Sequence, residues 1–207
     1  MKPRLLDLFC CQGGAGMGYA RAGFEVVGVD IDPQPRYPFE FVQADALAYL
    51  AEHGREFDAI HASPPCHDHT PLKSLAGTDD TGWLLPATRA ALDDLGVPYV
   101  LENVAAATMV DPITLCGGMF GLRTYRHRKF DSNITLTAPA HPKHVIRTAT
   151  KQRRARWAEG WHVSITGDVG TYVGPEGLGI DWMDGNGLSQ SIPPVYTEHV
   201  GRQLIKA

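Results

Sequence analysis

Short apolar runs alternate with helical patterns over the first hundred residues, and this order restricts the fold more than any other feature. Strands separated by helices of this length pair in parallel, with helices on both faces of the sheet. The sequence therefore predicts an α/β fold with a doubly wound, mostly parallel sheet. The expected strands are "RLLDLF" (4–9), "EVVGVD" (25–30), "FVQAD" (41–45), "FDAIHA" (57–62) and "VPYVLEN" (97–103). The expected helices are 17–23, 46–54 and 81–96, and Pro86 predicts a late start or a kink in the last one.

The pattern changes beyond Pro112. "TLCGGMFGL" (114–122) and "RKFDSNITLTA" (128–138) are typical of extended, antiparallel segments, and residues 137–182 read as a small irregular excursion. The chain ends in a predicted helix that Ser191 can cap. We therefore expect a catalytic domain formed by residues 1–136 and 183–207, with a small basic recognition region at 137–182.

Composition excludes some classes of protein. No apolar run is long enough to span a membrane, and the N-terminus has no signal-peptide pattern. The four cysteines form no paired framework and no CxxC motif, which is typical of a reducing compartment. We expect a cytoplasmic protein without a membrane partner.

The charge is distributed unevenly along the chain. Residues 121–160 contain ten Lys or Arg and two acids, a net charge of +8, whereas the remainder contains nine basic and 21 acidic residues, a net charge of −12. Such asymmetry predicts a face that binds a polyanion. A solvated basic loop is the alternative.

A glycine-rich turn follows the first strand. Gly13, Gly14, Gly16 and Gly18 allow the backbone to approach a ligand closely, as in nucleoside-binding sheets. Asp30, at the end of the second strand, is placed to accept from ribose hydroxyls, and Asp45, at the end of the third, from an adenine amine. No GKS or GKT follows, so the turn is not a P-loop. A nucleoside cofactor is expected here, with a bare structural turn as the alternative.

The segment "SPPCHDHT" (63–70) allows two kinds of chemistry. Cys66, His67 and His69 are metal-ligand types, but adjacent side chains diverge and the spacing fits no zinc motif, so no metal is expected. A nucleophilic Cys66 on a rigid Pro-Pro turn is the other interpretation, with Glu102 as a nearby acid. Arg126 and Arg128, two residues apart, would share one face of a strand. Taken singly, each of these residues also has an ordinary structural interpretation.

Five motifs in order resemble those of the DNA cytosine-5 methyltransferase family. They are "DLFCCQGGAGMGYARAGF" (7–24), "SPPC" (63–66), "ENV" (102–104), "RHRKF" (126–130) and "IPPVYTEHVG" (192–201). The resemblance spans about residues 4–135 and 186–201, and the short length and the ending are similar to small phage or actinobacterial members. It implies a Rossmann-like domain that binds S-adenosylmethionine, in a prokaryotic or phage-infected cell. The implied partner is double-stranded DNA with a flipped cytosine, bound by a monomer whose specificity a protein partner can supply.

The resemblance also implies a site. Cys66 would attack C6 of cytosine, Glu102 would hold the base edge, and Arg126 and Arg128 would orient the base and activate the thiol. The implied cofactor-binding residues are Phe9, Cys10, Gly13, Gly14, Gly16, Asp30, Ile31, Asp45, Ala46 and Pro64. The implied nucleic-acid-binding residues are His67, Lys143, Arg147, Lys151, Arg153, Arg154 and Arg156.

The chain departs from the family pattern at several positions. Cys11-Gln12 stands where the family usually has Gly-Ala, His67 where it has Gln, and Thr124 where a Gln commonly precedes the paired arginines. The recognition span is also short. Two alternatives therefore stay open: the same covalent chemistry on a nucleotide, RNA or a modified donor, and a degenerate relative that only binds DNA.

Overall fold

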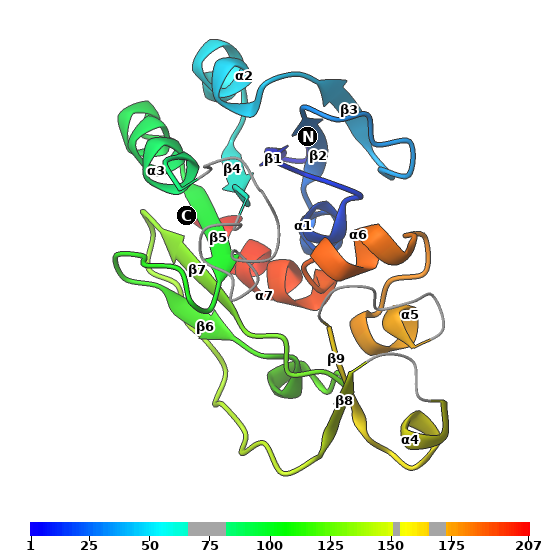
Figure 1. Ribbon diagram of the computed structural model, residues 1–207. Coiled ribbons are helices and arrows are strands. Elements are labelled where there is room, and N and C mark those ends of the chain that lie inside the picture. Colours follow the sequence, from blue (N-terminus) through cyan, green and yellow to red (C-terminus); the bar gives the residue numbers. More distant parts are fainter. Residues whose placement is uncertain (66–81, 151–153, 166–172) are drawn as a thin grey trace.

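The protein is described by a computed structural model over residues 1–65, 82–150, 154–165 and 173–207. A seven-stranded sheet in the order β3-β2-β1-β4-β5-β7-β6 forms its centre (Figure 1). The strands β1 to β5 are parallel, whereas β7 runs antiparallel to β5 and β6. The predicted doubly wound, mostly parallel sheet is confirmed. The strands are β1 (Arg4–Leu8), β2 (Glu25–Asp30), β3 (Glu40–Gln43), β4 (Ala59–Ala62), β5 (Tyr99–Val104), β6 (Ile113–Leu115) and β7 (Arg128–Ser132).

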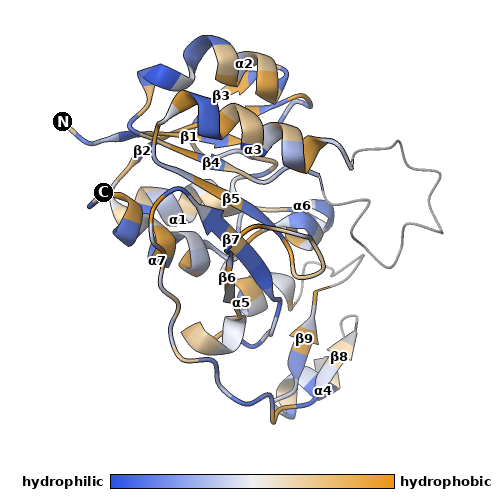
Figure 2. Ribbon diagram, turned by 90° about the vertical axis from the view of Figure 1, so that its left-hand side faces the viewer, coloured by the Kyte–Doolittle hydropathy of each residue, from blue (hydrophilic) through white to orange (hydrophobic). Residues whose placement is uncertain are grey.

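Helices cover both faces of the sheet (Figure 2). One core includes Leu50 of α2 (Ala46–His53) and Leu92 of α3 (Leu84–Leu95), and the other includes Tyr19 of α1 (Gly14–Ala22) and Tyr196 of α7 (Pro194–Leu204). The described residues of this part of the chain also form two 3-10 turns, η1 (Gly54–Glu56) and η3 (Gly117–Phe120). Pro86 is the third residue of α3, within the first turn, where a missing backbone N–H costs no helical hydrogen bond.

Helices α1 and α7 lie in close contact because glycines separate them. A side chain at Gly18 would collide with Thr197 and the Pro194 carbonyl, and one at Gly201 would collide with Tyr19 and Ala22. The hydroxyl of Thr197 donates to the carbonyl of Ala15 at 2.8 Å. Gly18, which the sequence reading placed in a ligand-binding turn, therefore serves helix packing.

The predicted cap of the last helix is wrong. Ser191 ends α6 (Gly185–Gln190) and its hydroxyl donates to the Leu188 carbonyl, whereas Pro193 is the N-cap residue of α7. The serine lies too early because the chain needs an extended link between the two helices, and Ser191 adopts that extended conformation.

The excursion has more order than the sequence predicts. It contains a two-stranded parallel sheet of β8 (Thr148–Thr150) and β9 (His162–Ser164), with α4 (Arg154–Ala158) and α5 (Gly174–Leu178) beside it. Its own apolar core includes Trp157 and Val163, and continues past the expected boundary at residue 182 to Met183 and Leu188. No helix within the described ranges is long and apolar enough to cross a membrane.

Candidate active site

The strand order reverses between β1 and β4, and ligands of open α/β sheets bind outside the carboxyl ends of the strands at such a point. Directly after β1, Phe9 and Cys11 adopt positive φ angles of 57° and 44°, and Gly13 follows at 82°. Positive φ is strained for residues other than glycine, and such strain concentrates at functional sites. The turn after β1 is therefore the strongest backbone signal for a site at this edge.

The carboxylate of Asp30 fixes the turn to the end of β2. Its Oδ2 accepts from the backbone N–H of Cys11 at 2.9 Å, and its Oδ1 accepts from that of Asp32 at 3.1 Å. The next residue, Ile31, is a large apolar side chain with 66% of its surface exposed. An exposed isoleucine beside a buried carboxylate suits a ligand that has both an apolar ring and polar hydroxyls.

The other expected cofactor residues lie at the same edge. Asp45 caps α2, since its Oδ1 accepts from the N–H of Ala48 at 2.8 Å, and Ala46 begins that helix. The N–H of Cys10 donates to the Val29 carbonyl at 3.2 Å, and Pro64 follows β4. Gly14, however, lies against Ile192, and Gly16 lies against the Asp7–Tyr37 pair. Protein atoms therefore occupy the space beside both glycines.

The departure at Gln12 has a structural explanation. Its side-chain amide donates to Asp184 Oδ1 at 3.0 Å and accepts from the Asp184 N–H at 3.2 Å, and its carbonyl accepts from the Trp182 indole at 2.8 Å. Gln12 thus connects the turn after β1 to the chain that enters α6. A glycine or alanine would lack the side-chain amide that makes two of these contacts.

Glu102 and Arg128 form the central charged pair. Arg128 Nε lies 3.0 Å from Glu102 Oε1, and only 6% of the Glu102 side chain and 15% of the Arg128 side chain are exposed. The pair follows from the antiparallel register, in which Glu102 is opposite Phe130 and Val104 is opposite Arg128, so that the two side chains are diagonal neighbours on one face. Burial raises the pKa of Glu102, whereas Arg128, a hydrogen bond from Ser63 and the charge of Arg126 lower it.

The segment that leads to Cys66 is anchored to β5. Asn103 Nδ2 donates to the carbonyl of Pro64 at 3.1 Å, and the hydroxyl of Ser63 contacts the Glu102 carboxylate. Two consecutive residues of the "ENV" motif therefore hold the start of the Ser-Pro-Pro turn. Cys66, His67 and His69 themselves lie outside the described residues.

A buried polar chain, which the sequence reading missed, leads from α1 to Glu102. The Tyr19 hydroxyl lies 3.0 Å from His61 Nδ1, and His61 Nε2 lies 2.8 Å from Ser63 Oγ. Since Ser63 donates to Glu102, the imidazole is consistently placed with its proton on Nε2 and its lone pair on Nδ1. Burial lowers the pKa of His61 to about 3, so this imidazole is neutral.

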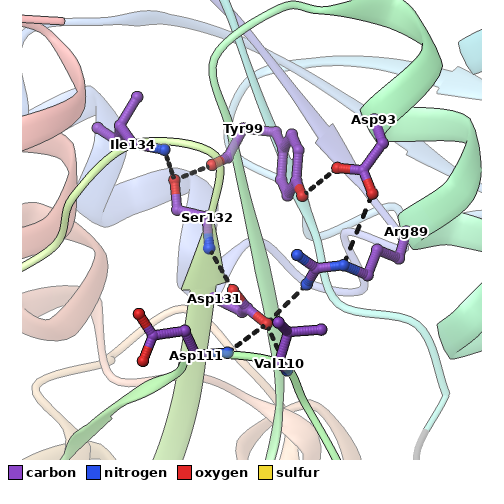
Figure 3. Close-up of polar contacts among 8 residues, drawn as sticks. All are labelled: Arg89, Asp93, Tyr99, Val110, Asp111, Asp131, Ser132 and Ile134. Carbon is purple, nitrogen blue, oxygen red and sulfur yellow. Dashed lines mark hydrogen bonds and ion pairs between the residues drawn. The ribbon is translucent and has the colours of Figure 1, made fainter.

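Asp131 holds the strand that carries Arg128. Its buried carboxylate accepts from Arg89 Nη1 of α3 at 2.6 Å and from the Val110 N–H at 2.9 Å (Figure 3). On the next residue, the Ser132 hydroxyl donates to the Tyr99 carbonyl of β5. These contacts fix β7 against β5, and thereby the position of Arg128.

Arg126 makes its described contacts with backbone carbonyls. Its guanidinium donates to the carbonyls of Ile165 at 3.1 Å, Ser189 at 2.8 Å and Ser191 at 2.8 Å. The residue precedes β7 and so does not lie on the strand itself, but its charge, like that of Arg128, lowers the pKa of Glu102. Arg126 ties the excursion and α6 to the site.

Asp7 is a further buried acid that sequence reasoning missed. It is 1% exposed, its Oδ2 accepts from the Tyr37 hydroxyl at 3.0 Å, and its Oδ1 has no hydrogen-bond partner in the described part of the chain. Burial raises the pKa of this carboxyl to about 8, although the Tyr37 hydrogen bond opposes the shift. The signal for Asp7 was present, since an acid inside the apolar run "RLLDLF" has to be buried.

In the basic excursion, two arginine side chains lie against one tryptophan ring. The guanidinium carbons of Arg147 and Arg156 lie 5.6 and 4.5 Å from the ring centroid of Trp161. Lys143 and Arg147 are exposed. Lys151, Arg153 and the side chain of Arg154 fall outside the described residues, so their expected contact with nucleic acid stays a prediction.

No family model and no curated protein sequence matches this chain. Solved structures do show similarity. A protein reported as a DNA modification methyltransferase encoded within a prophage in E. coli is 25% identical, with a TM-score of 0.48 over 62% of this chain and 45% of its own. The Dnmt2 methyltransferase of S. pombe is 14% identical, with a TM-score of 0.49 over 67% of this chain and 52% of its own.

A SAM-dependent methyltransferase of Agrobacterium tumefaciens is 21% identical, with a TM-score of 0.33 over 52% of this chain and 40% of its own. These likenesses assign the chain to no family. The chain spans about half the length of the first two structures. The description of the candidate site therefore rests on the contacts within this chain and not on these structures.

Proposed function

We propose that the chain transfers a methyl group from S-adenosylmethionine to C5 of cytosine in DNA through a covalent bond between Cys66 and C6. The observation that carries this proposal is the buried Glu102–Arg128 pair beside the anchored start of the Cys66 segment. An acid and a guanidinium on one face can bind the polar edge of a pyrimidine, while a thiol on the adjoining segment would attack its ring.

The residues at the carboxyl edge of the sheet fit the cofactor. Asp30 and Asp45 are the polar groups for ribose and adenine, and the exposed Ile31 would cover the ring. The strained backbone at Phe9 and Cys11 lies beside them. When bound, S-adenosylmethionine supplies an electrophilic methyl group.

Cytosine C5 is too weak a nucleophile to accept a methyl group unaided. In the proposed mechanism the Cys66 thiolate forms a bond to C6, and the electron pair of the C5–C6 double bond becomes available at C5. Glu102, whose pKa burial raises, holds N3 and the exocyclic amine and shares a proton with the ring. After C5 has gained the methyl group, a base removes the C5 proton and the C6–S bond breaks.

The remaining groups position this chemistry. Arg128 orients both the carboxylate and the base, and Arg126 holds the excursion against α6. The target base must leave the stack to reach a buried acid, and the cations of the excursion are suited to the phosphates on either side.

Transfer of tritium from labelled S-adenosylmethionine to double-stranded DNA tests the proposal. Duplex DNA should be labelled, and a duplex in which every cytosine is already methylated at C5 should not. Labelling of adenine in the digested product would contradict the proposal.

A second acceptor is favoured by one observation. The recognition region at residues 137–182 is short, so it offers little surface with which to read a duplex. Incubation with dCTP and with RNA therefore belongs in the same assay. Label in either of these but not in duplex DNA would replace the substrate and keep the chemistry.

A further inference from the structure

A cluster of one cysteine and three histidines lies outside the proposed active site. Cys116 lies between β6 and η3, His127 directly precedes β7, and His141 and His144 lie on the segment after β7. One donor atom of each residue lies within 4.8 Å of the others. The sequence predicts no metal, but that prediction rests on Cys66, His67 and His69, none of which belongs to this cluster.

Two distances within the cluster are close to the edges of a tetrahedral site. Cys116 Sγ lies 3.3 Å from His144 Nε2, and His127 Nε2 lies 3.1 Å from His141 Nε2. A tetrahedral zinc ion with its usual bond lengths to nitrogen and sulfur separates its ligand atoms by about 3.3 to 3.6 Å. Pairwise hydrogen bonds account for each short contact, but not for the convergence of all four donors on one point.

The surroundings suit ligation as well. His141 Nδ1 lies 2.9 Å from the Pro142 carbonyl, which leaves the lone pair on Nε2, the atom that faces the cluster. The His144 ring stacks on Tyr125, with ring centroids 3.7 Å apart and planes 14° apart.

We propose that Cys116, His127, His141 and His144 bind one zinc ion. Zinc is favoured over harder cations because a thiolate and three imidazoles form a nitrogen–sulfur donor set. Binding replaces the thiol proton of Cys116, which passes to solvent, and the three imidazoles bind as neutral ligands. With four protein ligands and no open position, the ion is structural.

The position of the proposed zinc ion indicates which parts of the chain it would hold together. The segment between β7 and β8 has no regular secondary structure, and within it residues 141–148 are exposed, so little apolar burial holds that part of the segment. An ion bound to Cys116 and His127 on one side and to His141 and His144 on the other would fasten this segment to the sheet. It would thereby fix the basic excursion relative to Arg128, and this holds whether or not the proposed methyl transfer is correct.

The test is the metal content of the full chain, purified with a phosphine reductant and measured by plasma mass spectrometry. One zinc per chain is expected, with loss of most of it in Cys116→Ser and His141→Asn. His199→Asn is the matched control, because His199 contacts the same segment through the Thr137 carbonyl but lies outside the cluster. Zinc that is retained in both ligand variants would overturn the proposal.

Cobalt(II) provides a readout that does not depend on how well a variant folds. When cobalt(II) is added to the reduced, metal-stripped wild-type chain, the absorption spectrum should show the intense visible bands of four-coordinate cobalt and a thiolate-to-cobalt charge-transfer band. Zinc should abolish both. A wild-type chain that binds neither ion would show that the four side chains are joined by hydrogen bonds alone.

Discussion

Glu102 Oε1 and Arg128 Nε lie 3.0 Å apart on adjacent antiparallel strands, and both side chains are nearly inaccessible to solvent. A buried pair of this kind contributes little net stability, because desolvation offsets the attraction. Apart from this ion pair, Oε1 makes no hydrogen bond with any described residue. In the proposed function, the base that Glu102 and Arg128 bind completes this arrangement.

Replacing Glu102 with Gln should lower the rate of methyl transfer about 100-fold, because the amide keeps the shape of the side chain but cannot share a proton with the base. Affinity for S-adenosylmethionine, measured by calorimetry, should stay within about threefold because Glu102 is not one of the expected cofactor-binding residues. The exposed Glu52→Gln is the matched control. Equal rates for the two variants would remove Glu102 from the mechanism.

Asn103→Ala should slow transfer more than it destabilises the chain. The change removes the donor to the Pro64 carbonyl and costs about 1 to 3 kcal/mol in the free energy of unfolding. Asn133→Ala removes comparable backbone contacts near the other end of β5, where Asn133 binds the Tyr99 N–H and the Val97 carbonyl. Urea unfolding should give similar losses for both variants, and only Asn103→Ala should lose most of its activity. Matching activity losses would show that the Pro64 anchor has no special role.

Asp7→Asn should change how stability depends on pH. The folded carboxyl has a pKa of about 8 against 3.8 for an unperturbed aspartate, so the folded state keeps a proton that the unfolded state has lost. Stability therefore falls by about 1.4 kcal/mol per pH unit as pH rises from about 4 to 8 through this group. The difference in unfolding free energy between the Asp7→Asn variant and wild type, measured in urea at pH 5, 6.5 and 8, should grow with pH in favour of the variant. A difference that is constant over this range would show that Asp7 is ionised throughout.

His61 should make stability depend on pH in the opposite direction from Asp7. Its folded pKa is about 3 against 6.5 for an unperturbed histidine, so the unfolded state binds the extra proton and stability is lost as pH falls from about 6.5 toward 3. His61→Asn should remove this slope and still offer a partner to the Tyr19 hydroxyl, whereas His61→Phe should also leave that hydroxyl unpaired and cost about 1 to 3 kcal/mol more. Thermal unfolding of the two variants at pH 5 and pH 7 measures both effects. Equal stability of the two variants would argue against a Tyr19–His61 hydrogen bond.

The sheet and its carboxyl edge could be predicted because strand periodicity and turn residues are local properties. Phe9, Asp30, Asp45 and Pro64 each lie at or just beyond the end of a strand, and parallel pairing brings such positions together. The roles of Asn103, Ser63 and His61 could not be read in the same way. They depend on which strands are neighbours and on register, and both are fixed by packing of the whole domain.

Two further features required long-range information. Cys116 and His144 are 28 residues apart and meet only once β6 and β7 have paired. Gly18 and Gly14 looked like part of a ligand turn, but they make room for α7 and for the chain that precedes it. A glycine in such a turn indicates that another group lies close to the backbone, but the sequence does not show whether that group belongs to a ligand or to the protein.

Covalent trapping on duplex DNA that contains 5-fluorocytosine tests the central claim most directly. Fluorine at C5 cannot leave as a proton does, so the C6–S bond should persist after methyl transfer. Denaturing electrophoresis should show one adduct that requires S-adenosylmethionine, and peptide mapping should assign it to Cys66. An adduct on Cys10, Cys11 or Cys116, or methylation of ordinary DNA by the Cys66→Ser variant at the wild-type rate, would contradict the account.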